Sequence, residues 1–218
     1  MDYSQFFNMI PEAGLMAILV IVFLADLFMK GEKKHTTLSM LTCVLLVAQV
    51  VLCFNAQPAE AFAGLYTATA AAQVMKVILT AGAFIVVVMA QSWIVREDVL
   101  RKEGEFYELV ISTLLGMYMM ISSGHFLMFF LGLEMASVPM ACLVAFDKYK
   151  KNSAEGAAKF VLTATFSSGV MLYGISFLYG ACGTLYFDDV AAKISASPLT
   201  IMGLVFFFSG LGFKISLV

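Results

Sequence analysis

The 218-residue sequence is 61% hydrophobic and 13% charged, with a formal net charge of −2 and a mean hydropathy of +0.93. Soluble domains contain about 25% charged residues, so the composition excludes a soluble protein and predicts an integral, multi-pass protein within the lipid bilayer. The sequence has no basic tract that would indicate a nucleic-acid partner.

Seven apolar runs are long enough for membrane-spanning helices, which need about 20 mostly apolar residues. In chain order they cover roughly residues 12–29, 38–54, 74–94, 107–123, 126–146, 156–180 and 199–218. The runs are continuous, whereas strands of a membrane barrel would be about ten residues long with alternating polarity. The sequence therefore predicts an all-α, polytopic transmembrane helix bundle with about seven helices.

The basic residues are distributed unevenly among the loops and predict the orientation of the bundle. The loops after the first, third and fifth runs contain Lys30, Lys33, Lys34, Arg96, Arg101, Lys102, Lys148, Lys150 and Lys151. The alternate loops contain a single basic residue, Lys193. Because cytoplasmic loops are enriched in lysine and arginine, we expect the N-terminus to lie outside.

The first and last runs lack processing and stop signals. The first has no preceding basic region and no small-residue cleavage site, so we expect a retained helix and not a removed signal peptide. The seventh reaches Val218 without a polar flank or a turn. We therefore expect a fragment, a truncated product or one half of a split protein.

One acid lies in the middle of the fifth run. Glu134 is eight residues beyond Phe126, or about 12 Å at 1.5 Å per residue, near the middle of a hydrocarbon core about 30 Å thick. A charge there costs roughly 2.5–3.5 kcal/mol and usually faces a bundle interior, a partner or a hydrated path. Ser137, Ala141 and Ala145 follow on the same helix face and predict the close approach of another helix.

Pro139 interrupts the backbone hydrogen bonding of the same helix. It cannot donate a backbone hydrogen bond and its ring clashes with the carbonyl of Met135, so this carbonyl is freed one residue after Glu134. A kink with a free polar group beside a buried acid favours water or a cationic partner.

The sixth run contains Lys159, for which two interpretations are open. It could be an interfacial lysine or an i,i+4 partner of Glu155. It could also begin a hydrated proton path, because Thr163 and Ser167 extend a stripe of hydroxyl groups inward from it.

The seventh run contains Lys214, which follows Gly210 and Gly212. A straight helix from Leu199 would place it about 22 Å from the outer surface, deeper than Glu134. A direct pair of Glu134 and Lys214 would then need helix tilt, a break at the glycines or a bridging water. The alternative is that Lys214 is an anchor at the inner interface.

The remaining ionisable residues and thiols give weaker signals. Glu12 and Asp26 are close to the ends of the first run and are interpreted as interfacial, and Lys76 lies at the outer start of the third. The cysteines form no CxxC or Cys/His cluster, so we expect no metal, iron–sulfur or disulfide site: Cys43, Cys53, Cys142 and Cys182. One buried acid and two candidate buried lysines could nevertheless relay protons, because burial favours the neutral forms and pairing restores the charged forms.

Three ordered motifs carry a resemblance to a known family: FLGLEMASVPMACLVAF, SAEGAAKFVLTATFSSGVMLYGISFLYGACGTL and GLGFKISLV. They closely resemble the subunit N family of antiporter-like membrane subunits in the proton-pumping NADH:quinone oxidoreductase, bacterial respiratory complex I. The match runs from about Glu105 to Val218, and the first hundred residues agree in helix number and spacing only. The resemblance implies a three-helix segment at 1–104 and a first antiporter-like inverted repeat at 105–218, incomplete at its C-terminus.

The resemblance also implies roles for single residues. Glu134 would be the fifth-helix glutamate, Lys159 the sixth-helix lysine and Lys214 the lysine of an interrupted seventh helix, on ion paths that meet along a midplane row of charges. The chain would be a translocase subunit in the bacterial inner membrane, packed against other membrane-arm subunits. It would contain no redox centre or cofactor, because NADH, flavin, iron–sulfur clusters and quinone would bind other subunits.

Family members continue through about seven more helices, so the resemblance implies that this chain does not translocate protons alone. One alternative is a subunit of a multisubunit cation/proton antiporter or a membrane-bound hydrogenase, which reuse these motifs. Another is a non-transporting fragment that acts as a packing scaffold, in which a Lys214→Met variant would function normally.

Overall fold

The computed structural model describes residues 3–29, 34–95, 102–147 and 150–215. Within these ranges the chain forms seven long helices: α1 (Ile10–Phe28), α2 (Lys34–Asn55), α3 (Ala70–Ile94), α5 (Glu103–Ile121), α6 (Phe126–Val144), α7 (Lys151–Cys182) and α9 (Pro198–Lys214). Shorter elements are the 3-10 helix η1 (Tyr3–Met9), the helix α8 (Phe187–Lys193) and the strands β1 (Ala59–Ala61) and β2 (Tyr66–Ala68). The predicted helical bundle is confirmed, and each of the seven predicted runs corresponds to one long helix.

Part of the evidence for orientation lies outside the described residues. This applies to Lys30, Lys33, Arg96, Arg101 and Lys148, and to the end of the seventh run at 216–218. The orientation with the N-terminus outside therefore stays a prediction.

Five of the described helical segments are long and apolar enough to cross a membrane: Gln5–Phe28, Lys34–Asn55, Ala70–Ile94, Phe126–Val144 and Asn152–Cys182. The helix α9 is apolar but shorter, and α5 begins with three carboxylates within its first six residues. Large apolar side chains are exposed along the outer helix faces, among them Phe54, Leu162 and Phe166 at 81%, 71% and 68%. Such faces suit contact with lipid tails, since a soluble monomer rarely exposes large contiguous apolar patches.

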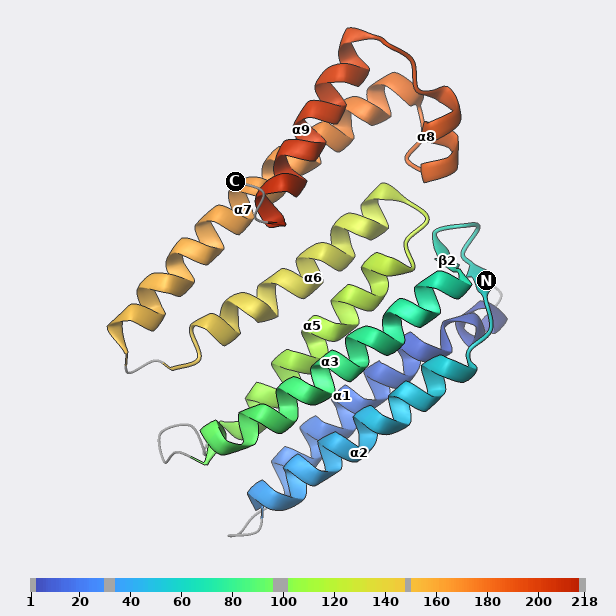
Figure 1. Cartoon of the computed structure of the whole chain (residues 1–218). Helices are drawn as coiled ribbons and strands as arrows, with labels where there is room; N and C mark the ends of the chain where they lie inside the picture. Colours follow the sequence, from blue (N-terminus) through green and yellow to red (C-terminus); the bar gives the residue numbers. More distant parts are fainter. Residues whose placement is uncertain (1–2, 30–33, 96–101, 148–149, 216–218) are drawn as a thin grey trace.

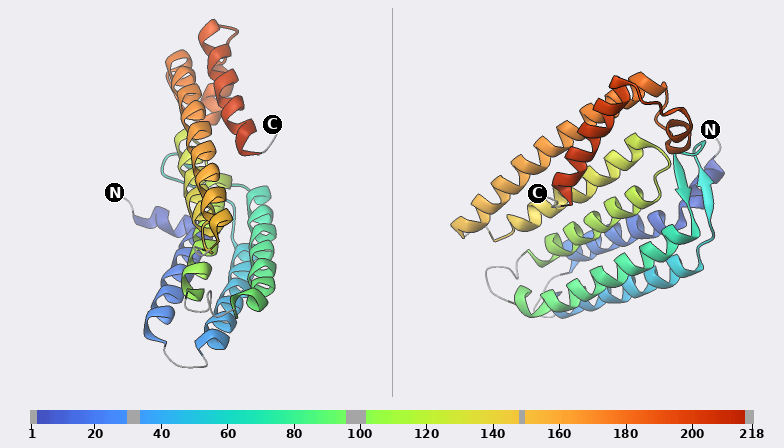
Figure 2. Two further views of the ribbon diagram at one scale, coloured as in Figure 1. Left: turned by 90° about the vertical axis from the view of Figure 1, so that its left-hand side faces the viewer. Right: turned by 45° about the horizontal axis from the view of Figure 1, so that its top comes forward.

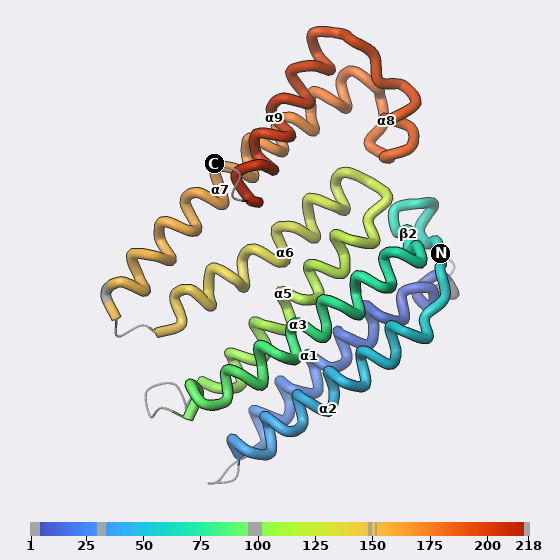
Figure 3. The backbone as a smooth tube through the Cα atoms, viewed as in Figure 1, coloured from blue at the N-terminus to red at the C-terminus, as the bar shows by residue number. Residues whose placement is uncertain are grey.

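The long helices lie side by side and alternate in direction along the chain (Figure 1). The first four, α1, α2, α3 and α5, surround a core that includes Leu15, Leu46, Ile111 and Tyr118. Next to this group lies α6, which packs most extensively on α5, and beyond it the pair α7 and α9 (Figure 2). The tube in Figure 3 shows that the connection through α8 returns α9 alongside α7.

Glycines allow close contacts between α5 and α6 and between α7 and α9. An ideal Cβ on Gly116 of α5 would lie 2.4 Å from the backbone nitrogen of Ala136 in α6. A Cβ on Gly174 of α7 would lie 2.4 Å from the backbone nitrogen of Phe207 in α9. Small residues allow such backbone approach within a membrane, where packing and not water exclusion drives helix association.

A short antiparallel hairpin lies where the sequence predicts only a loop. Strands β1 and β2 pair Ala59 with Ala68, and the ring of Tyr66 is fully buried. The strands are three residues long, too short for a readable alternation of polarity. The turn contains one glycine in the left-handed region, Gly64, but Phe62 and Ala63 before it also adopt this conformation, which glycine and asparagine normally supply.

Candidate functional site: a buried ion pair between α6 and α9

The buried acid and one of the two candidate lysines form a direct ion pair. Lys214 Nζ donates to Glu134 Oε1 at 2.6 Å, with side-chain exposures of 11% and 30%. The hydroxyl of Ser168, on α7, donates to the same carboxylate oxygen. Side chains from α6, α7 and α9 therefore meet at one carboxylate.

The two helices are offset along their axes: the first residue of α6 lies beside a residue in the middle of α9, and this offset allows the direct pair. The ring of Phe126, the first residue of α6, packs edge to face against Phe207 at 5.3 Å between centroids. From this shared level, Glu134 is eight residues further along α6 and Lys214 is seven residues further along α9. At 1.5 Å per residue these are nearly equal distances, about 12 and 10.5 Å. The helix α9 also runs unbroken through Gly210 and Gly212 to Lys214, so the direct pair forms without the break at the glycines that was one of the expected routes.

The proline after the acid does not interrupt the helix. The helix α6 continues through Pro139 to Val144, and the hydroxyl of Ser137 donates to the carbonyl oxygen of Glu134 at 3.3 Å. The cationic partner predicted for the acid is Lys214, which is also the last residue of α9.

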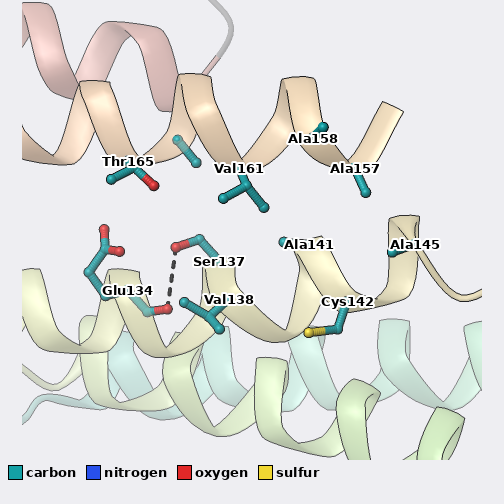
Figure 4. Close-up of a pocket in the computed structure, with 11 residues that line it drawn as sticks. Glu134, Ser137, Val138, Ala141, Cys142, Ala145, Ala157, Ala158, Val161 and Thr165 are labelled. Atoms are coloured by element: carbon teal, nitrogen blue, oxygen red, sulfur yellow. Dashed lines mark hydrogen bonds between the residues drawn. The ribbon is translucent and has the colours of Figure 1, made fainter. Parts of the chain in front are cut away.

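The small-residue stripe beyond Glu134 faces a groove and not a tightly packed helix (Figure 4). The groove has a volume of about 440 Å³ and lies between α6 and α7. Ser137, Ala141 and Ala145 line it from α6, and Ala157 and Val161 line it from α7. The predicted close approach along this stripe is therefore wrong, since α6 makes its close contact with α5 on another face.

A second cavity, of about 280 Å³, reaches the lysine of the ion pair. Lys214, Ser137, Thr163 and Ser167 supply the polar groups of its lining. The stripe of hydroxyls predicted on the sixth run thus faces Lys214. Polar groups around a space of this size could order water, which needs two to four polar partners.

Lys159 lies apart from the ion pair. Its side chain is 73% exposed and donates to Glu155 one helical turn earlier, at 2.5 Å. This is the i,i+4 pair that the sequence offered as one of the two interpretations. On α7 the hydroxyl of Thr163, which lines the cavity at Lys214, donates to the backbone carbonyl of Lys159 at 2.7 Å.

Ser168 was not singled out from the sequence, although a signal for it exists. Val161, Ala164 and Thr165 line the groove between α6 and α7, and Ser168 follows them at the spacing that continues one helix face. The sequence draws attention instead to the neighbouring Ser167, which belongs to the stripe that begins at Lys159.

A second buried ion pair was also missed, and the interfacial interpretation of Glu12 is wrong. Lys76 Nζ donates to Glu12 Oε1 at 2.6 Å, and the two residues are 0% and 3% exposed. Tyr66 donates to the other carboxylate oxygen at 2.9 Å, and the hydroxyl of Ser122 lies 3.3 Å from the first. The pair is buried because the unpredicted hairpin covers this end of the bundle.

The surroundings of this second pair keep the Tyr66 hydroxyl protonated, so that it donates to Glu12. Burial, followed by the charge of Glu12, raises the pKa of Tyr66 far above its ordinary value. The Lys76 ammonium also lies 5.4 and 5.5 Å from the ring centroids of Tyr66 and Tyr118, at cation–π distance. All polar groups of the pair thus have partners, as a structural ion pair requires.

The described residues contain no group of three or more His, Cys, Asp or Glu side chains placed to hold a metal ion. The four cysteines are free thiols.

The fold and the site together are those of a multi-helix membrane bundle with a glutamate–lysine pair at the meeting point of three helices, and the comparisons with known proteins identify the class as antiporter-like membrane subunits. The family model described as "NADH:quinone oxidoreductase/Mrp antiporter, TM" matches residues 123–218. This region contains Glu134, Lys159 and Lys214.

The whole chain is similar to NADH-quinone oxidoreductase subunit N. The subunit N of Phocaeicola vulgatus is 52% identical over 218 residues, which are 100% of this chain and 46% of that protein. The subunit N of Azobacteroides pseudotrichonymphae is 44% identical over 100% of this chain and 46% of its own length. The chain therefore belongs to the subunit N family of antiporter-like membrane subunits and spans about half the length of the curated relatives it matches.

Solved structures agree with this family assignment. A chain of respiratory complex I from Thermus thermophilus with bound aureothin superimposes with a TM-score of 0.77 at 26% identity, covering 94% of this chain and 43% of that chain. A chain of the membrane-bound sulfane sulfur reductase, an archaeal respiratory membrane complex, gives a TM-score of 0.75 at 19% identity over 94% and 44% of the two chains. The second likeness shows the shared fold alone. The chain is thus an integral, multi-pass membrane protein.

Proposed function

We propose that this chain supplies the first half of a membrane-arm subunit of NADH:quinone oxidoreductase and carries part of its proton path. The observation that supports the proposal most directly is the ion pair of Glu134 and Lys214, partly buried between α6 and α9. Intramembrane ionisable residues are costly and mark ion or proton pathways. Electron transfer from NADH to quinone would take place in other subunits.

The pair can move a proton by changing partners. With Glu134 in place, its carboxylate accepts directly from Lys214 Nζ at 2.6 Å. If the carboxylate turns away or is neutralised, Lys214 loses its partner and releases its proton into the cavity lined by Ser137, Thr163 and Ser167.

The cofactors and partners follow from the same proposal. NADH, flavin, iron–sulfur clusters and quinone would bind other subunits, and this chain would pack against neighbouring membrane-arm subunits in a bacterial inner membrane. The part of Lys159 in the path stays a prediction, based on its position one turn before Thr163.

A cation/proton antiporter subunit is the second candidate, because the matching family model includes Mrp antiporters. The relatives named subunit N, at 52% and 44% identity along the whole chain, favour the oxidoreductase.

Replacing Glu134 with Gln in the complete complex tests the proposal. The substitution keeps the size of the side chain and removes the charge that holds Lys214. We expect NADH-driven proton uptake by membrane vesicles to fall by about tenfold or more, since positioned proton-transfer groups contribute about 100-fold or more to rates. The measurement is the initial rate of dye quenching at equal complex content.

Glu60→Gln is the matched control, because Glu60 is an exposed carboxylate in the hairpin. It should leave proton uptake unchanged. Normal uptake in the Glu134→Gln vesicles would refute the proposed role of the pair.

A further inference from the structure

The side chain of Gln73 is buried without a hydrogen-bond partner. The residue is 7% exposed, and neither its amide nitrogen Nε2 nor its oxygen Oε1 has a partner among the residues that the structure describes. Buried polar groups nearly always have a partner, so an unpaired amide calls for an explanation. An amide that can both donate and accept implies a ligand that can do both.

Gln73 faces a cavity of about 280 Å³ between α2 and α3. Its other lining residues are apolar or small, including Phe54, Pro58, Val74 and Ile78, and none is charged. The thiol of Cys53, also in the lining, is already within 3.1 Å of the Tyr118 hydroxyl. The cavity therefore offers an apolar wall and one free amide, the composition typical of a site for a mostly apolar ligand.

The cavity lies on the lateral face of the bundle. Phe54, Val74 and Ile78 at its edge are 81%, 60% and 57% exposed, on the face of two helices long and apolar enough to cross a membrane. Gln73 is three residues into α3, about 4.5 Å below the start of the helix, and Ile78 is about 12 Å below it. This places the amide near the boundary between headgroups and acyl chains and the apolar wall beneath it.

We propose that this cavity binds a phospholipid, with an acyl chain along Val74 and Ile78 and the glycerol region at Gln73. When the Gln73 side chain rotates toward the cavity, Nε2 donates to an ester carbonyl, and Oε1 accepts from a hydrogen-bond donor in the headgroup. The donor is either the ammonium of phosphatidylethanolamine or a hydroxyl of phosphatidylglycerol. A lipid fits better than a partner helix, because the free groups are at ester depth and the space is a small cavity between two helices.

The test compares thermal unfolding of the purified chain in detergent with three added lipids. Phosphatidylethanolamine and phosphatidylglycerol carry headgroup donors, whereas phosphatidylcholine carries none. A donor-bearing lipid at tenfold excess over its Kd should raise the Tm by about 3–6 °C. Phosphatidylcholine should raise it clearly less.

Two variants make the result specific. Gln73→Leu should lose the lipid-induced rise, while its Tm without lipid equals or exceeds that of the unchanged chain, because the variant removes an unpaired buried amide. Gln91→Leu is the control on the same helix, since Gln91 already donates to Cys43 Sγ at 3.7 Å. It should keep the lipid response.

An equal lipid response in Gln73→Leu and the unchanged chain would overturn the proposal, as would the absence of any response. Photolabelling in native membranes gives a second readout. A photoactivatable phosphatidylethanolamine should label α3 in the unchanged chain and several-fold less in Gln73→Leu. Crosslinking of a Gln73→Cys variant to another polypeptide, with no lipid label on α3, would assign the cavity to a protein partner instead.

Discussion

Lys214 and Lys159 carry the same functional group in opposite surroundings. Lys214 is 11% exposed and donates to Glu134, which is 30% exposed, whereas Lys159 is 73% exposed and donates to Glu155, itself 65% exposed. An exposed i,i+4 pair contributes about 0.3–0.5 kcal/mol. Removal of one partner from a buried pair costs far more, because the remaining charge is left uncompensated.

We therefore expect Lys159→Met to reduce proton uptake less than Lys214→Met in the complete complex. Both substitutions replace a lysine with a methionine, so the comparison isolates the effect of the surroundings of each lysine on proton uptake. A loss of about tenfold or more in Lys214→Met and a smaller loss in Lys159→Met is the expected result, measured by NADH-driven dye quenching. Equal losses would show that Lys159 has a larger part in the path than its exposure in this chain suggests.

At the scale of elements, two helix pairs differ in how they meet. The helices α7 and α9 touch backbone to backbone at Gly174 and again at Gly210, where an added Cβ would lie 2.5 Å from the carbonyl of Ser167. The helices α6 and α7 instead enclose a groove that ends at Glu134. The glycine contacts hold Lys214 at the level of the acid, while the groove leaves one side of the acid uncovered within the described residues.

Gly174→Ala should weaken the packing of α7 on α9. The new methyl group would lie 2.4 Å from a backbone nitrogen of α9, and overpacking of this kind costs about 1–3 kcal/mol. Gly169→Ala is the matched control on the same helix, since a Cβ there meets nothing within 4 Å. It should be neutral or stabilise by up to about 1 kcal/mol through helix propensity. Denaturant unfolding in detergent measures both, and similar values for the two variants would contradict the packing argument.

At the scale of the whole molecule, a fully buried ion pair and a partly buried one lie in two separate groups of the described helices. Glu12 and Lys76 join α1 to α3 beneath the hairpin, and Glu134 and Lys214 join α6 to α9. The first pair has its polar groups satisfied by Tyr66 and other neighbours. The second opens onto a groove and a cavity. These surroundings suit a structural role for the first pair and the proposed transport role for the second.

Lys76→Met should destabilise the fold strongly, by about 3–5 kcal/mol, because it leaves the Glu12 carboxylate buried without a counter-charge. Glu12→Gln should be costly for the same reason. The double variant should cost less than the sum of the two, since it removes the unpaired charge. The double-mutant cycle is measured by denaturant unfolding in detergent, and strict additivity would argue against direct coupling of the pair.

The sequence predicted the properties that a single helix has by itself, such as its length, its apolarity and the depth of a residue along it. The seven apolar runs match the seven long helices because spanning length and apolarity are local. The burial of Glu134 could be predicted in the same way, from its place eight residues into an apolar run. The family motifs then singled out Lys214 and Lys159 without any knowledge of their contacts.

The tertiary structure alone decided which groups meet. The axial offset that brings Lys214 level with Glu134 depends on the packing of Phe126 on Phe207, and hydropathy contains no information about such offsets. Ser168 reaches the carboxylate, and Lys159 does not, because the packing of α7 decides which of its faces meets α6. Glu12 and Lys76 are 64 residues apart and become a buried pair only when the hairpin covers them. Apolar sequence determines how deep a residue lies along its own helix, whereas contacts between distant helices determine its partner.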